Sequence, residues 1–286
     1  MIVVIGVIIF LINLKEDIMI MPKYTEYYVD DELVITKQGK QIKVLELKPN
    51  NEDDAIEEWA RHLRRHYIND GELIDLSEIM GIPNNQVLSN LIFPDPSDKF
   101  GKSTMVGDFT EIMIADYLQY VNDYVVPRTR YDHKDKRNRS TQGSDLIAYS
   151  MENHSVSSLH DELRVYEVKA QSSDSLPKLK LQEAINDSEK DFTRLAESMV
   201  TSCRRLLATD RKADAKIVAR FLNDTDRPYQ TIHGAAAVHS DKSYSKDLLK
   251  DVDVSMFSKQ GIELIVIHCN QLLSFILQMY ERASKC

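Results

Sequence analysis

The sequence predicts an α/β protein (α+β in its N-terminal part) with a mixed central sheet flanked by helices. Three observations carry this prediction. Strand-like and helical segments alternate along the second half of the chain, as in sheets covered by helices. The segment IELIVIH at 262–268 is apolar enough for a central strand buried on both faces. Residues 23–47 show short alternating stretches with Gly39 as a turn, which indicates a small antiparallel sheet in the N-terminal region.

Two helical segments follow these first strands. Apolar residues recur at helical spacing across 53–68, and the acidic start and basic end suit the helix dipole. Residues 75–93 form a short helical connection that stops at Pro94 and Pro96. We therefore place a boundary there and divide the chain into an apolar segment at 1–18, an α+β region at 19–95 and the main domain at 96–286.

The main domain begins with a helix at 107–121. Five strand candidates lie at 145–150, 163–170, 217–222, 232–239 and 262–268. A long amphipathic helix at 187–208 separates the second candidate from the third, with an apolar face that includes Phe192, Leu195, Met199, Cys203 and Leu206.

Composition limits the function classes. Hydrophobic residues make up 43% of the chain and charged residues 28%, which is typical of an ordinary soluble globular protein. The three cysteines lack C-x-x-C spacing, which indicates neither a disulfide framework nor a zinc knuckle and favours the reducing cytoplasm. The net charge of −9 argues against a protein that coats nucleic acid by charge alone.

The first residues form a nearly continuous apolar run from Ile2 to Ile12. It has no preceding Lys or Arg and is shorter than the roughly 20 residues that a spanning helix needs. We interpret it as a buried or accessory segment, translated from an upstream start, with Met19 or Met21 as the natural beginning. A membrane anchor is the alternative.

The sharpest local feature is the run YEVKAQ at 166–171. In a strand, Glu167, Lys169 and Gln171 project from one face, where three polar groups need a partner or a metal if the strand is covered. Asp145 adds a carboxylate two residues after the turn-permitting Gly143. Glu111 shares a helix stripe with apolar residues and therefore points toward the sheet.

This residue set suits phosphodiester hydrolysis. Two carboxylates hold a hard divalent cation, and an ammonium group orients or polarises the attacking water. The order of Glu111, Asp145, Glu167 and Lys169 resembles that of PD-(D/E)XK nucleases, which have a restriction-endonuclease-like core. The resemblance implies that Asp145 and Glu167 bind Mg²⁺ or Mn²⁺, that Lys169 serves catalysis, and that Glu111 and Gln171 support the site. Ser144 stands where the motif has Pro.

A closer resemblance is to the HamA family of nuclease subunits from Hachiman anti-phage systems. The segments GDFTEIMIADYL, GSDLIAY, YEVKAQ and GAAAVHSD are similar to that family's core in the same order, over about residues 100–270. The resemblance implies a DNA substrate and a helicase partner. The region at 19–95 is the predicted contact with that partner, because it shows no chemical constellation of its own.

A basic loop leads into the Asp145 strand. Residues 128–139 hold six Lys or Arg and two Asp, a local net charge of +4. Either these cations contact phosphate beside the site or they form a solvated loop. The candidate DNA-contacting residues are Arg128, Arg130, Lys134, Lys136, Arg137 and Arg139. The long helix adds Lys190, Arg194, Arg204 and Arg205 as further candidates.

Other motifs in the sequence give weaker evidence about function. Gly101-Lys102-Ser103 is not a P-loop, because Pro96 stands where its first Gly is required, so the chain shows no ATP-binding signature. No H-E-x-x-H motif exists. We interpret the histidines and cysteine in or near apolar segments as core or surface residues: His233, His239, His268 and Cys203.

The sequence thus favours a metal-dependent DNA nuclease gated by a helicase partner. One alternative is a catalytically silent subunit of the same fold that binds DNA ends or regulates a helicase. Another is a restriction-type endonuclease, with the N-terminal part as a recognition module.

Overall fold

The computed structural model describes residues 21–50, 53–132, 134–141, 143–153, 155–189, 191–257 and 261–286. The apolar segment predicted at 1–18 lies outside this part of the chain. Among the helices described here, none has the length and apolar character needed to cross a membrane.

A mixed sheet organises the molecule, as predicted. Seven strands of the described chain take part, in the order β1-β3-β7-β6-β5-β4, with β2 beside β3. The strands β3, β7, β6 and β5 are parallel, whereas β1 and β4 run antiparallel at the two edges. The bounds are β1 Tyr28–Asp30, β2 Val34–Ile35, β3 Gln41–Leu47, β4 Leu146–Ser150, β5 Glu162–Gln171, β6 Gln230–Ser240 and β7 Ile262–Cys269.

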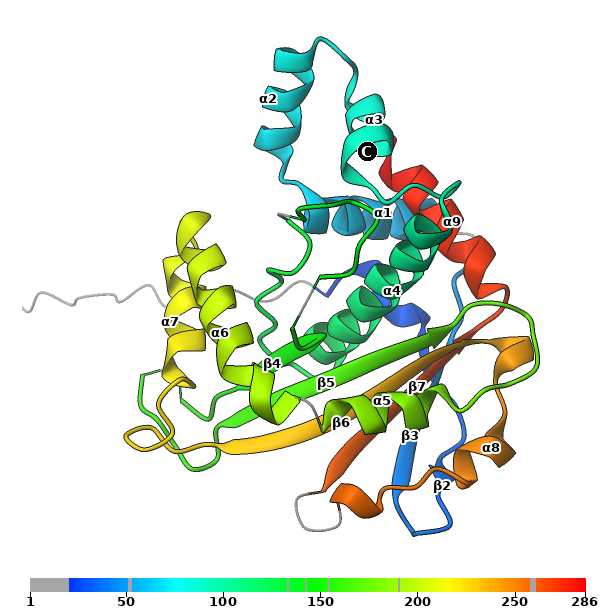
Figure 1. The fold of residues 1–286 in the computed structure, drawn as a ribbon, viewed down its shortest axis with the longest axis vertical. Coiled ribbons are helices and arrows are strands. Elements are labelled where there is room, and N and C mark those ends of the chain that lie inside the picture. Colours follow the sequence, from blue (N-terminus) through cyan, green and yellow to red (C-terminus); the bar gives the residue numbers. More distant parts are fainter. Residues whose placement is uncertain are drawn as a thin grey trace, which may run out of the picture.

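Helices cover both faces of this sheet (Figure 1). Their bounds are α1 Asp53–Tyr67, α2 Asp70–Met80, α3 Asn84–Val87, α4 Lys99–Asp116, α5 Lys180–Ser188, α6 Asp191–Ala208, α7 Lys212–Arg220, α8 Lys246–Lys250 and α9 Leu272–Ala283. Short 3-10 turns (Lys23–Tyr27, Asp241–Ser243, Ser255–Phe257) and π turns (Leu88–Ile92, Tyr117–Val121) complete the structure. In Figure 1, α2 and α3 project away from the sheet.

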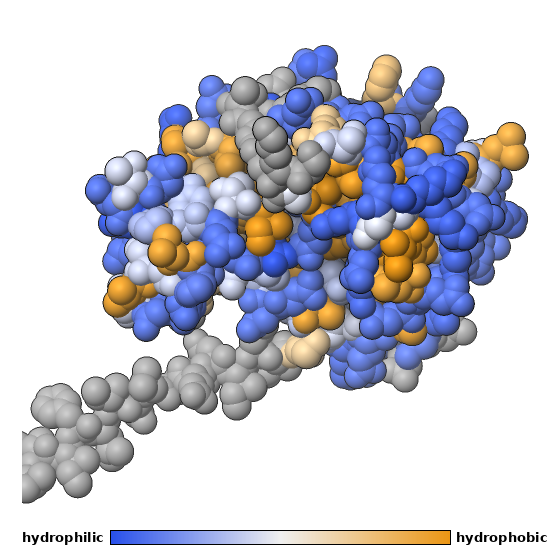
Figure 2. Space-filling view, turned by 90° about the horizontal axis from the view of Figure 1, so that it is seen from below, coloured by the Kyte–Doolittle hydropathy of each residue, from blue (hydrophilic) through white to orange (hydrophobic). Residues whose placement is uncertain are grey.

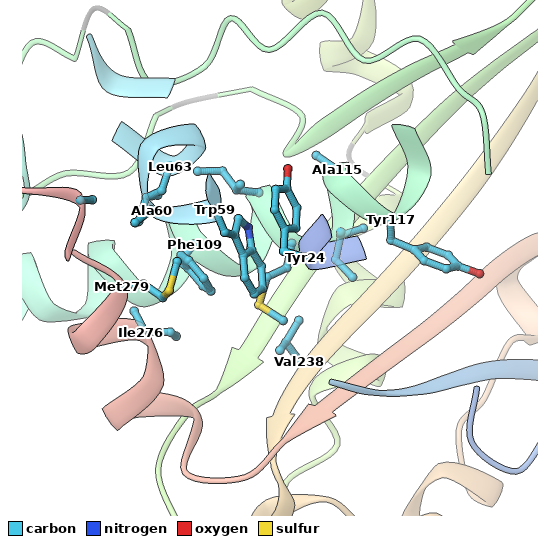
Figure 3. Close-up of a cluster of buried hydrophobic side chains, with 14 of the residues drawn as sticks. Tyr24, Trp59, Ala60, Leu63, Phe109, Ala115, Tyr117, Val238, Ile276 and Met279 are labelled. Carbon is cyan, nitrogen blue, oxygen red and sulfur yellow. The ribbon is translucent and has the colours of Figure 1, made fainter. Parts of the chain in front are cut away.

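The largest core cluster lies between one face of the sheet and α1, α4 and α9. Trp59 is fully buried at its centre, stacked on Tyr24 with ring centroids 5.0 Å apart and packed against Phe109 (Figure 3). The apolar stripe predicted on α1 is buried as expected. On the other face, β5 and β4 pack against α6 and α7 around Tyr149, while β6 and β7 pack against α5.

The N-terminal region is part of the same sheet. β1 and β2 pair antiparallel with β3, in line with the predicted small antiparallel arrangement, but β3 also pairs in parallel with β7. The core cluster around Trp59 likewise joins residues of α1 to residues of α4, β5 and α9. The boundary predicted near residue 95 therefore does not coincide with a division of the sheet or of the core.

Three predicted elements differ in the structure. The segment 217–222 was expected as a strand but is mostly the end of α7, because Ala215 and Val218 lie on one helical face and pack toward Tyr149. The helix predicted at 187–208 is confirmed as α6 but begins at Asp191, and residues 187–188 end a separate helix, α5, that was not predicted. The helix predicted from residue 107 begins at Lys99, where the Asp98 carboxylate caps the amides of Phe100 and Gly101.

Outside these cores the surface is largely polar. On the face shown in Figure 2, hydrophobic residues occur in separate patches bordered by hydrophilic ones. Large apolar side chains are also exposed on the projecting helix α2 and on the π turn Leu88–Ile92 that follows α3. They are Ile74, Ile79, Met80 and Leu91, of which Ile79 is 82% exposed.

Candidate active site

A cleft of 1130 Å³ lies where α4, β4, β5 and α6 meet. Four of the five predicted catalytic residues line it: Glu111, Asp145, Glu167 and Lys169. They come from a helix, a turn and a strand that are distant in sequence. The fold thus brings together the carboxylates and the ammonium group that the sequence analysis selected.

Asp145 is positioned by the turn before β4. Gly143 has φ +102°, a conformation that disfavours side chains, and a Cβ there would lie 2.9 Å from Ser198 Oγ. The same Ser198 hydroxyl accepts the backbone N–H of Ser144 at 3.1 Å. Asp145 Oδ2 then accepts the N–H of Val168 at 3.0 Å, which fixes the carboxylate against β5.

Glu167 and Lys169 project from the same face of β5, as predicted from strand alternation. Glu167 is 4% exposed and accepts a hydrogen bond from Arg194 of α6 at 2.9 Å. Lys169 Nζ lies 3.5 Å from Glu167 Oε2 and 2.7 Å from Asp187 at the end of α5. Burial opposes the charge on Lys169, but the bond to Asp187 and the charge of Glu167 raise its pKa, so it stays an ammonium group.

Glu111 reaches the cleft from α4 and is joined to Asp145 by Arg130. The Arg130 guanidinium lies 2.8 Å from Glu111 Oε2 and 2.7 Å from Asp145 Oδ1, and Tyr131 donates to Glu111 at 2.5 Å. Burial raises the pKa of Glu111 to about 8, opposed by the charge of Arg130 and supported by that of Asp145. The protonation state of the Glu111 carboxyl therefore changes with pH in the neutral range.

Gln171 lies apart from the other four. Its side-chain amide donates to Ser175 Oγ at 3.0 Å and to the carbonyl of Leu176 at 2.9 Å, and its carbonyl accepts the N–H of Lys178 at 2.9 Å. It does not line the described cleft. Gln171 therefore stabilises the loop that follows β5.

The basic loop divides into two groups of cations. Lys136 and Arg139 are exposed and line the cleft. The other four pair with carboxylates of the protein: Arg128 with Asp116, Arg130 with Asp145 and Glu111, Lys134 with Asp108, and Arg137 with Asp95. Most of the local positive charge is thus compensated within the fold.

The α6 cations divide similarly. Arg194 and Arg205 line the cleft, where Arg194 holds Glu167 and Arg205 donates to the carbonyl of Thr129 at 2.6 Å. Arg204 is exposed, and Lys190 lies outside the described residues.

The sequence analysis did not select two carboxylates of this region, Asp108 and Asp187. Asp108 lies one helical turn before Glu111, is 1% exposed and pairs with Lys134 and Tyr67. Burial raises its pKa above the usual range. Its spacing from Glu111 was a usable signal, since i, i+3 residues share a helix face. Asp187, the partner of Lys169, had no such signal, because α5, the helix that carries it toward β5, was not predicted.

The other motifs and residues singled out in the sequence lie within helices, strands or the core. Residues 100–104 lie within α4 rather than in a phosphate-binding loop. His233, His239 and His268 are buried in β6 and β7, in agreement with their interpretation as core residues. Cys203 is partly buried against the cluster around Tyr149, and burial raises the pKa of its thiol.

Fold and cleft together define a class: an α/β protein whose mixed sheet carries a carboxylate and lysine cluster beside an antiparallel edge. The chain belongs to the HamA family, whose model matches residues 22–283, nearly the whole length. This membership makes it a protein associated with the two-component Hachiman defence system. No curated protein matches the chain.

Proposed function

We propose that this protein is a metal-dependent deoxyribonuclease of the PD-(D/E)XK type that acts in anti-phage defence. The observation that carries the proposal is the convergence of Glu111, Asp145, Glu167 and Lys169 on one cleft. Family membership agrees with a defence role. Carboxylates gathered at a cleft wall cost free energy unless arginines or a bound cation compensate them, so the cluster also suits a cation.

The donor chemistry of the cleft fits a hard divalent cation. Mg²⁺ and Mn²⁺ take oxygen ligands, and Asp145 and Glu167 offer carboxylate oxygens at the cleft wall. These oxygens already attract positive charge, since Arg130 and Arg194 pair with them. Asp145 and Glu167 would hold the cation, which when bound would neutralise charge developing on the phosphate.

The side chains of this chain have separate roles in the proposed hydrolysis. In the reaction a water oxygen attacks phosphorus and the bond to the leaving sugar oxygen breaks. Lys169, held as an ammonium group by Asp187 and Glu167, orients the water or stabilises negative charge on the phosphate. Glu111 keeps Arg130 beside Asp145 and so orients the Asp145 carboxylate.

Cleavage of plasmid DNA tests this proposal. The purified chain, alone and with the proposed helicase partner, is incubated with Mg²⁺, Mn²⁺ or a chelator. We expect Asp145→Ala and Glu167→Ala to abolish metal-dependent cleavage and Lys169→Ala to slow it by orders of magnitude. The matched control is Lys180→Ala, which removes a lysine from α5 that pairs with Glu183 outside the cleft. Full activity of Asp145→Ala would disprove the assignment.

A second candidate function has one observation in its favour. Asp145 and Glu167 are each compensated by an arginine of the same chain, so the cluster is electrically satisfied without a metal. A silent subunit that binds DNA or regulates a helicase would show this arrangement. Metal binding by calorimetry separates the two functions: the nuclease binds Mg²⁺ or Mn²⁺ through Asp145 and Glu167, and the silent subunit does not.

The helicase partner is part of the same proposal, in which ATP-driven movement on DNA controls access to the cleft. The HamA family belongs to a two-component system, and the net charge of −9 disfavours tight DNA binding by this chain alone. We assign the partner contact to the region before Pro94, where α2 and α3 project from the sheet (Figure 1). Apolar side chains are exposed there on α2 and on the π turn Leu88–Ile92. Deletion of residues 1–95 cannot test this contact, because it removes β3 from the sheet.

A further inference from the structure

A second cluster with metal-ligand chemistry lies outside the cleft, between α1 and the end of α4. His62 and His66 occupy successive turns of α1 and face Asp116 of α4. His62 Nε2 lies 2.9 Å from Asp116 Oδ1 and 3.1 Å from His66 Nε2. One ligand atom from each of the three residues lies within 4.8 Å of the other two.

Proton counting shows that hydrogen bonds alone cannot satisfy both contacts of His62 Nε2. A neutral imidazole nitrogen either carries one hydrogen or accepts one. If His62 Nε2 carries it, that one hydrogen must serve both Asp116 and His66. If it does not, its lone pair faces the Asp116 carboxylate at 2.9 Å. A cation at the point where the three atoms converge satisfies all of them at once.

The separations suit a tetrahedral transition-metal ion. Zinc bonds to imidazole nitrogen and carboxylate oxygen of about 2.0–2.1 Å place tetrahedral ligands roughly 3.3 Å apart. The two measured separations, 2.9 and 3.1 Å, need only a small expansion to reach that value. Imidazole ligands favour zinc and related metals over magnesium.

The surroundings hold the ligands in place. Asp116 is fully buried, and its second oxygen accepts the indole N–H of Trp59 at 3.1 Å. Trp59 is in turn fixed by its stack on Tyr24 (Figure 3). Such second partners orient metal-binding carboxylates. Arg128 also donates to Asp116 Oδ1 at 2.7 Å, so its positive charge competes with a bound cation.

We propose that His62, His66 and Asp116 form a binding site for a Zn²⁺-class transition-metal ion that ties α1 to α4. The side chain of His62 is 22% exposed, which leaves a fourth position reachable from solvent. The two histidines have the i, i+4 spacing of zinc-protease helices, but Leu63 replaces the glutamate that serves those enzymes as a base. The site is therefore structural or regulatory rather than hydrolytic. Because Arg128 also lines the cleft, metal binding would weaken its bond to Asp116 and free it toward the cleft.

Cobalt substitution of the full-length chain tests this proposal. Chelator-treated protein is titrated with Co²⁺, and we expect the strong visible absorption of a tetrahedral site to saturate at one equivalent and to be lost when Zn²⁺ displaces the Co²⁺; an ion held by the cleft oxygens would add only weak absorption. His62→Gln and His66→Gln should each lower the affinity at least tenfold. The exposed His160→Gln is the matched control. Asp145→Ala, which removes a proposed cation ligand of the cleft, should keep the full tetrahedral absorption.

Thermal unfolding of the same proteins gives an independent readout. Zn²⁺ bound to the folded state should raise the Tm of wild type and of His160→Gln equally, and the rise should be smaller in His62→Gln, where only the cleft can still bind the ion. If His66→Gln fails to fold, the partly exposed His62 still tests the site. Tetrahedral Co²⁺ absorption that survives in both His62→Gln and His66→Gln, or its absence from wild type, would overturn the proposal.

Discussion

Arg130 balances the charge of the cleft, and its removal should have a large and metal-dependent effect. Its guanidinium pairs with Glu111 at 2.8 Å and Asp145 at 2.7 Å, and its side chain is 14% exposed. Removing one partner of a buried ion pair costs about 3–5 kcal/mol, because the other charge is left uncompensated. Arg130→Ala leaves Glu111 and Asp145 without their guanidinium partner. Glu111, with a pKa of about 8, can take up a proton and so lose its charge. We therefore expect a loss of about 3–5 kcal/mol rather than twice that amount.

A cation should restore much of this loss. If Asp145 and Glu167 hold Mg²⁺, the ion replaces the charge of Arg130, whereas in wild type it must compete with that guanidinium. At 100 times its dissociation constant a ligand stabilises the folded state by about 2.7 kcal/mol. We expect Mg²⁺ to stabilise Arg130→Ala by about that amount and wild type by less.

Urea denaturation with chelator or with Mg²⁺ measures both effects. The matched control is Arg164→Ala, which removes an arginine of similar exposure (13%) that pairs with Glu162 and Glu263 away from the cleft. It should be destabilised without any gain in its response to Mg²⁺. A loss below about 1 kcal/mol in Arg130→Ala, or an equal Mg²⁺ response in all three proteins, would refute the reasoning.

Three further predictions concern DNA, pH and the partner. Lys136→Gln combined with Arg139→Gln should reduce the salt dependence of DNA binding by about two units, because each lost phosphate contact removes about one; an unchanged slope assigns both to plain solvent exposure. The raised pKa of Glu111 favours its neutral form in the fold, so the stability that it contributes is present below about pH 4.5 and is lost as pH rises to about 8. Glu111→Gln should remove this loss from the pH profile of Tm, and an unaltered profile would contradict the assignment. Ile79→Asp should weaken co-purification with the helicase, whereas Leu176→Asp, equally exposed beyond β5, should not; equal recovery would exclude α2 from the contact.

The sequence by itself determined which side chains share one face of β5. Strand alternation places Glu167 and Lys169 on one face whatever the rest of the chain does, because the period of a strand is local. Gly143 likewise predicted a turn before Asp145, and the structure has φ +102° there. The apolar run of β7 predicted a central strand for the same local reason, since a strand covered on both faces needs no polar side.

Tertiary structure alone decided which partners these residues meet. β3 joins β7 across more than 200 residues of chain, and no periodicity encodes such a pairing. Arg130 and Arg194 were candidates for DNA contact, but the fold places their charges beside Asp145 and Glu167, where opposite charges compensate buried groups. Sequence patterns report which side of an element a residue faces, whereas long-range packing decides what lies on that side.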